Sequence, residues 1–135
     1  MQPENNFQDL QIFEDPKMNK YCDFVSNQVM EIVGKQPHLV GSVARMFTGS
    51  LPENYMPKDV DFAIDNISFR KILAFGKYRK LFPFAKMVEK RPERFIIYTD
   101  KKVIELWNFF YKNYTEELKF YNNKIPFLCQ YDSKQ

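Results

Sequence analysis

Two aspartates separated by one residue, Asp59 and Asp61, form the part of the sequence best suited to chemistry. Successive side chains of a strand alternate between its two faces, so residues at i and i+2 point the same way. Val60, Phe62 and Ile64 would take the opposite face and bury it. Close carboxylates repel and raise each other's pKa unless a cation lies between them. Mg²⁺, or Mn²⁺ in its place, suits such oxygen ligands, so we expect a metal–phosphate site here.

A Gly-Ser pair, Gly41 and Ser42, precedes the aspartates and predicts a phosphate-binding turn. Residues 42–48 predict a short helix, for which Ser42 is a suitable N-cap. A glycine lets the backbone approach a ligand closely, and free N–H groups at a helix start favour phosphate. We therefore expect Gly41 and Ser42 to hold a triphosphate, with Arg45 and Lys58 as further phosphate contacts. A plain helix cap for Ser42 and surface charge for Arg45 and Lys58 are the alternatives.

This order of motifs resembles the nucleotidyltransferase superfamily related to DNA polymerase β. Its signature is an apolar residue followed by Gly-Ser or Gly-Gly, a helix, and Asp-x-Asp between apolar residues. The matching segments here are Val40-Gly41-Ser42 and Asp59-Val60-Asp61-Phe62. The family carries a third carboxylate on a later strand, and the best match is Glu105 in Val103-Ile104-Glu105-Leu106-Trp107. The resemblance covers roughly residues 38–108. Within the superfamily, the sequence is similar to the minimal nucleotidyltransferase and abortive-infection toxin branches.

Two features depart from the family pattern. Ser42 and Asp59 are separated by sixteen residues, which is longer than the minimal pattern and predicts an inserted loop. The third acid, Glu105, is a glutamate where the family usually has aspartate. For Glu105 the alternative is an acid on the exposed face of a hairpin strand.

The resemblance implies a Mg²⁺-dependent transfer of a nucleoside monophosphate from an NTP, with ATP expected, to a hydroxyl acceptor. The acceptor classes it implies are a nucleic acid, a protein or a small molecule. Asp59 and Asp61 would hold metal, and Glu105 would complete the metal site or accept the proton of the acceptor. Minimal members often act with a helical partner protein, so such a partner or a homodimer is expected. The alternative is a non-catalytic binding module of the same fold, such as an antitoxin or an assembly subunit.

The length and composition predict a single globular domain. The chain has 135 residues with 14 Phe and 8 Tyr, enough to bury a sizeable core. We expect residues 1–14 to form a flexible lead and residues 15–135 the domain. The sequence has no apolar run of membrane-spanning length and no recognisable leader, which favours a cytoplasmic protein with no membrane contact. Cys22 and Cys129 form no Cys-x-x-Cys pair and, with His38 as the only histidine, make no usual zinc site.

Positive charge is concentrated between residues 70 and 94. This stretch holds nine Lys or Arg and two Glu, so it carries a local charge of +7 while the whole chain carries +3. A solvated basic face is the simpler interpretation. The alternative is a surface that attracts a triphosphate or a polynucleotide acceptor.

Hydrophobic spacing and turn residues predict an α/β (α+β) fold, a small mixed sheet flanked by helices. The helix that begins at Asp15-Pro16 should end at Gly34, because Asp caps, Pro suits the first position and Gly ends helices. The other expected helices are 42–48, 67–81 and 114–122. The expected strands are 38–41, 58–64, 84–89 and a hairpin of 94–99 with 102–108 around Asp100-Lys101.

Overall fold

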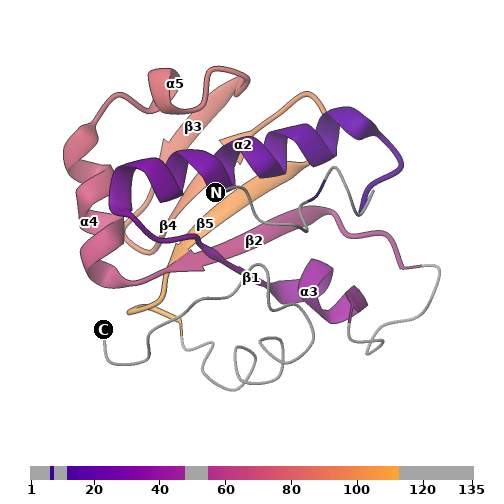
Figure 1. Ribbon diagram of the computed structural model, residues 1–135, viewed down its shortest axis with the longest axis horizontal. Coiled ribbons are helices and arrows are strands. Elements are labelled where there is room, and N and C mark those ends of the chain that lie inside the picture. The colour runs from indigo at the N-terminus through magenta and orange to yellow at the C-terminus, as the bar shows by residue number, and fades with distance from the viewer. Residues whose placement is uncertain (1–6, 8–11, 48–54, 113–135) are drawn as a thin grey trace.

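The structure, a computed structural model, describes residues 7, 12–47 and 55–112 (Figure 1). It has a mixed α+β architecture in which helices flank a five-stranded mixed sheet, which confirms the fold class at this level. The described elements, in chain order, are α2 (Pro16–Val33), β1 (His38–Val40), α3 (Gly41–Phe47), β2 (Asp59–Ile64), α4 (Asn66–Phe75), α5 (Tyr78–Leu81), β3 (Met87–Lys90), β4 (Arg94–Tyr98) and β5 (Val103–Asn108).

Two neighbouring inner strands of the sheet, β2 and β5, come from distant parts of the chain. The order is β1-β2-β5-β4-β3, with β2 and β5 parallel and the other neighbours antiparallel. In the β2–β5 register Asp59 lies opposite Val103, and Asp61 lies opposite Glu105. Because residues at i and i+2 share a face, this register puts both aspartates and the glutamate on the same face of the sheet.

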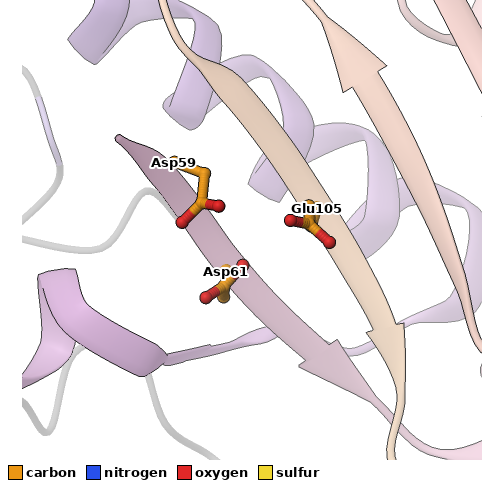
Figure 2. Close-up of side chains that lie close together, drawn as sticks. All are labelled: Asp59, Asp61 and Glu105. Carbon is orange, nitrogen blue, oxygen red and sulfur yellow. The ribbon is translucent and has the colours of Figure 1, made fainter. Parts of the chain in front are cut away.

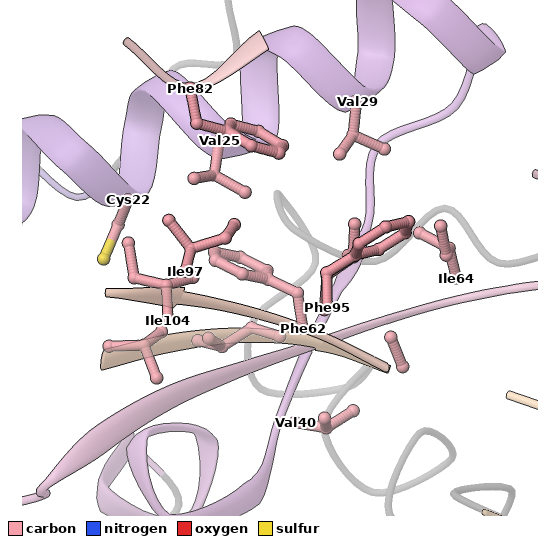
Figure 3. Packing of buried hydrophobic residues seen from close by; sticks show 14 of the residues in the cluster. Cys22, Val25, Val29, Val40, Phe62, Ile64, Phe82, Phe95, Ile97 and Ile104 are labelled. Carbon is pink, nitrogen blue, oxygen red and sulfur yellow. The ribbon is translucent and has the colours of Figure 1, made fainter. Parts of the chain in front are cut away.

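The other face of the sheet forms the hydrophobic core. Figure 3 shows Cys22, Val25 and Val29 of α2 directed toward Phe62 on β2 and Ile104 on β5. All five of these side chains are fully buried. Complete burial of a large apolar side chain is worth about 1.5–3 kcal/mol, so this face anchors the strands that carry the carboxylates.

The ends of α2 follow the sequence prediction. The Asp15 side chain accepts a hydrogen bond from Lys17 N at 2.9 Å, and Pro16 occupies the first helical position. Gly34 ends the helix in the left-handed conformation with φ +79° and donates its N–H to Met30 O. Within α2, Asn19 is buried and exchanges two 2.8 Å hydrogen bonds with the backbone of Phe13.

The prediction of one helix over residues 67–81 is wrong. The structure divides this segment into α4 and α5, because Gly76 adopts φ +72° and closes α4 with its N–H directed to Ile72 O. A left-handed glycine is a common helix end, and the apolar spacing continues across it only because α5 packs on the same core. Two other bounds shift: the strand predicted at 84–89 lies at Met87–Lys90, and α3 begins at Gly41, so Ser42 lies inside its first turn rather than at its cap.

Several predictions fall on residues outside the described ranges, namely the helix at 114–122, most of the loop 49–57 and Cys129. Most of the predicted lead, 1–14, is also outside them, although Phe7 and Phe13 are both buried in the core. The hairpin of 94–99 with 102–108 is confirmed as antiparallel β4 and β5. Among the described helices, none is long and apolar enough to cross a membrane.

Candidate metal centre

Asp59, Asp61 and Glu105 meet on the open face of the sheet. Figure 2 shows the aspartates on β2 and the glutamate on the neighbouring β5, with all three side chains on the same side of the two strands. One oxygen from each residue lies within 4.8 Å of the others, and all three side chains are half-buried. The predicted trio is therefore brought together by the parallel register of β2 and β5.

The environment of Asp61 disfavours its charge. Burial, followed by the negative charges of Asp59 and Glu105, raises the pKa of Asp61 to about 7. The indole N–H of Trp107 and the ammonium of Lys112 oppose this increase. The cluster therefore carries more negative charge than its own cations compensate, which is the condition that a bound cation relieves.

Glu105 has a cation beside it already. Arg94 Nε lies 2.5 Å from Glu105 Oε2, and the same guanidinium also pairs with Glu93. Burial raises the pKa of Glu105, the Arg94 charge lowers it, and the Asp59 charge raises it again, with a net increase. One oxygen of Glu105 is thus held by Arg94, which leaves the other as the available ligand.

Arg94, Trp107 and Lys112 border the trio and were not identified from the sequence. The Arg94 guanidinium carbon lies 4.7 Å from the centre of the Trp107 ring, and Lys112 Nζ lies 4.8 Å from it. Arg94 and Trp107 are register partners across β4 and β5, so both share the face of Glu105. The signal available was the hairpin itself, since its alternation places Arg94, Glu105 and Trp107 on one face once its register is known.

Gly41 touches the trio directly, and its predicted contact with a triphosphate stays a prediction. It adopts φ +72°, a region in which L side chains are strained. A Cβ at this position would overlap Asp61 Oδ2 and lie 3.2 Å from the Cβ and Cγ of Asp61. The space that a side chain would take is therefore filled by the Asp61 carboxylate. The pairing of Val40 with Asp61 at the end of β1 explains this contact.

The remaining predicted site residues lie on α3 and immediately before β2. Ser42 is half-exposed in the first turn of α3, and Arg45 is half-exposed further along the same helix. Lys58 is exposed and immediately precedes β2. The phosphate-binding roles of Ser42, Arg45 and Lys58 stay predictions.

His38 and Cys22, which the sequence does not place in a zinc site, are both buried. His38 is 3% exposed on β1, and burial lowers its pKa to about 4 against a smaller opposing effect from Asp65. Cys22 is a free, fully buried thiol whose pKa is raised by burial. Neither residue has the exposure of a nucleophile or metal ligand, and burial keeps the Cys22 thiol protonated at neutral pH.

The donor set of the trio fits a hard divalent cation. Carboxylate oxygens are the ligands of Mg²⁺ and Mn²⁺, and Mg²⁺ commonly takes one or two protein carboxylates and completes its coordination with water and phosphate. The raised pKa of Asp61 indicates that burial and mutual repulsion disfavour the ionised cluster, and a bound cation would offset that repulsion. The trio could therefore hold one such ion, with Glu105 contributing the oxygen that Arg94 does not engage.

Comparison of the chain with protein-family models, with curated proteins and with solved structures finds no match.

Proposed function

We propose that the protein is a Mg²⁺-dependent nucleotidyltransferase of the polymerase β-like fold that moves a nucleoside monophosphate from an NTP, ATP by expectation, to a hydroxyl acceptor and releases pyrophosphate. The observation that carries this proposal is the convergence of Asp59, Asp61 and Glu105 from two parallel neighbouring strands. The adjacent Gly41, at the end of a strand and the start of a short helix, supports it because the order of motifs resembles the signature of that superfamily.

The roles of the three carboxylates follow from their surroundings. Asp59 and Asp61 would bind the metal that accompanies the triphosphate. Glu105, held in place by Arg94, would contribute a third carboxylate ligand or accept the proton of the acceptor hydroxyl. Bound Mg²⁺ would neutralise the triphosphate and lower the pKa of that hydroxyl.

Gly41 keeps the Asp61 carboxylate in position, since its missing side chain leaves the space that the carboxylate fills. Ser42, Arg45 and Lys58 are the residues proposed to contact the triphosphate. Such a site would work by positioning the reactants and by balancing charge.

The second candidate is a non-catalytic binding module, an antitoxin or assembly subunit that acts with a helical partner protein or as a homodimer. The contact between Arg94 and Glu105 favours this candidate, because an internal cation already neutralises one of the three acids. A protein that needed Glu105 only for this ion pair would use the carboxylate cluster for stability or recognition.

Label transfer from α-labelled ATP and Mg²⁺, to the chain itself or to total RNA from a cell extract, tests the proposal. Glu105→Gln should nearly abolish transfer while ATP binding largely survives, because Asp59 and Asp61 remain. Glu93→Gln is the matched control, since Glu93 pairs with the same Arg94 but lies outside the trio. Its transfer should equal that of the wild type.

The outcomes separate the two candidates. Equal transfer by wild type and Glu105→Gln would remove Glu105 from the reaction. ATP binding without transfer to any acceptor would favour the binding module. Absence of both nucleotide binding and transfer would contradict the proposed function.

A further inference from the structure

A cluster of exposed cations lies at the edge of the sheet, on α5, β3 and the connection between them. We name it the basic edge and define it by five residues of the charged stretch noted in the sequence: Lys77, Arg79, Lys80, Lys86 and Lys90. Figure 1 shows α5 beside β3 at one end of the molecule. A hydrogen bond from Arg79 Nη1 to Lys86 O, 2.9 Å long, ties the two segments together.

Among the described residues, no acid forms an ion pair with the cations of the basic edge. The two glutamates of the surrounding stretch have partners of their own, since Glu89 pairs with Arg91 and Glu93 pairs with Arg94. An unpaired cluster of this kind creates a positive potential that attracts polyanions.

Part of the basic edge lines a shallow depression, to which Lys77, Arg79 and Lys80 contribute. The depression has a volume of about 320 Å³ and is lined by Gly76, Lys77, Tyr78, Arg79, Lys80 and Val88. Beside it, Phe75 at the end of α4 is 45% exposed. Cations around an open hollow with a neighbouring aromatic ring are the features that single-stranded nucleic acids use, through backbone contacts and base stacking.

The basic edge is separate from the metal centre. β3 is the outermost strand, and β4 and β5 lie between it and β2. At about 4.8 Å per strand, β3 is about 14 Å from β2. Val88 lines the depression, and Glu89 next to it points to the opposite face of β3. Glu89 pairs with Ile96 of β4, and Ile96 pairs with Glu105 of β5, so Glu89 shares the face of the metal centre. Val88 is therefore on the other face of the sheet.

We propose that the basic edge binds the phosphate backbone of a single-stranded nucleic acid. The lysine and arginine side chains contact successive phosphates around the depression, and Phe75 offers a face on which a base stacks. This binding goes beyond the proposed transfer reaction and needs neither the metal nor the nucleotide. The hollow shape favours a flexible strand, which can follow a concave surface, over a planar lipid membrane.

Fluorescence anisotropy with a labelled single-stranded 20-nucleotide RNA, in EDTA and at increasing NaCl, tests the proposal. Five phosphate contacts predict a slope of log affinity against log salt of about −3.5, at about −0.7 per contact for single strands. Lys77→Gln with Lys80→Gln removes two contacts, so the slope should become about −2.1 and the affinity at low salt should fall about tenfold or more.

The matched control is Lys17→Gln with Lys101→Gln, which removes the same charge from lysines that are paired with Asp100 and Asp15. These lysines lie at the start of α2 and in the β4–β5 turn, and the control should bind RNA like the wild type. Equal losses in the two double variants would show a net-charge effect and overturn the proposal.

Two further arms distinguish the occupant and the site. Tighter binding to anionic phosphatidylserine vesicles than to RNA, reduced in the same way by the lysine substitutions, would overturn the proposal in favour of a membrane. Asp59→Asn with Asp61→Asn should leave RNA binding in EDTA at least as tight as in the wild type. Loss of RNA binding in that variant would assign the strand to the carboxylate face and overturn the basic edge as its site. Failure of transfer with RNA binding intact would affect only the proposed reaction.

Discussion

Replacing Gly41 by alanine should damage both the stability of the fold and the metal centre. Alanine at φ +72° costs about 1–2 kcal/mol from the left-handed backbone alone. The added Cβ would also overlap Asp61 Oδ2, so the carboxylate must rotate or the strand end must move. An off-rotamer side chain adds about 0.5–1.5 kcal/mol. The expected total is about 1.5–3.5 kcal/mol.

Gly34→Ala is the control that separates the two contributions. Gly34 has φ +79°, close to that of Gly41, but nothing lies within 4 Å of its added Cβ. This variant should lose only the backbone part, about 1–2 kcal/mol. Urea unfolding with and without Mg²⁺ measures both effects, with a shift of about 3–4 °C in Tm per kcal/mol as a second readout for a chain of this size.

The two glycine variants should also differ in how far Mg²⁺ stabilises them. Stabilisation by Mg²⁺ with ATP should persist in Gly34→Ala and fall sharply in Gly41→Ala, because only the second substitution displaces Asp61. Equal stabilities and equal metal responses in the two variants would show that the contact between Gly41 and Asp61 does not exist in solution.

Two predictions concern pH. Because the pKa of Asp61 is raised to about 7, metal must displace a proton at lower pH, so the apparent affinity for Mn²⁺ should fall about tenfold from pH 8 to pH 6, as measured by calorimetry. Burial lowers the pKa of His38 to about 4. Between pH 6.5 and pH 4 the unfolded chain therefore binds a proton on this imidazole that the folded chain does not bind. The free energy of unfolding should consequently fall by about 2 kcal/mol from pH 7 to pH 5. Asp61 titrates with the opposite sign, because protonation of its raised-pKa carboxyl stabilises the folded state as pH falls. The test is therefore the difference between wild type and His38→Gln in urea unfolding; a constant difference across this range would rule out a buried, neutral His38.

The local parts of the fold were predictable because they depend on neighbouring residues. Asp15, Pro16 and Gly34 fix the ends of α2 through a side-chain cap, a preset φ and a left-handed conformation. The shared face of Asp59 and Asp61 follows from strand alternation alone. By contrast, Gly76 was placed inside a helix because apolar spacing continues past it, and only packing of α5 reveals the break.

The parts that depend on long-range pairing were only partly predictable. The position of Glu105 opposite Asp61 requires the parallel pairing of β2 with β5, which the sequence does not encode locally. The family resemblance indicates only that Glu105 is the third carboxylate. Arg94 was missed because its contact with Glu105 depends on the register of the hairpin. For Gly41 the residue was identified but the reason was incomplete, since the close approach involves Asp61 of the chain itself.

The most direct test of the metal centre is a crystal structure with a non-hydrolysable ATP analogue and Mn²⁺, read by anomalous scattering. The account predicts a Mn²⁺ peak bound by Asp59 and Asp61, with Glu105 beside it and phosphate oxygens of the analogue completing the coordination. The Asp59→Asn with Asp61→Asn variant, treated in the same way, should show no peak there. Nucleotide and Mn²⁺ bound elsewhere, or a peak that persists in the double variant, would contradict the assignment.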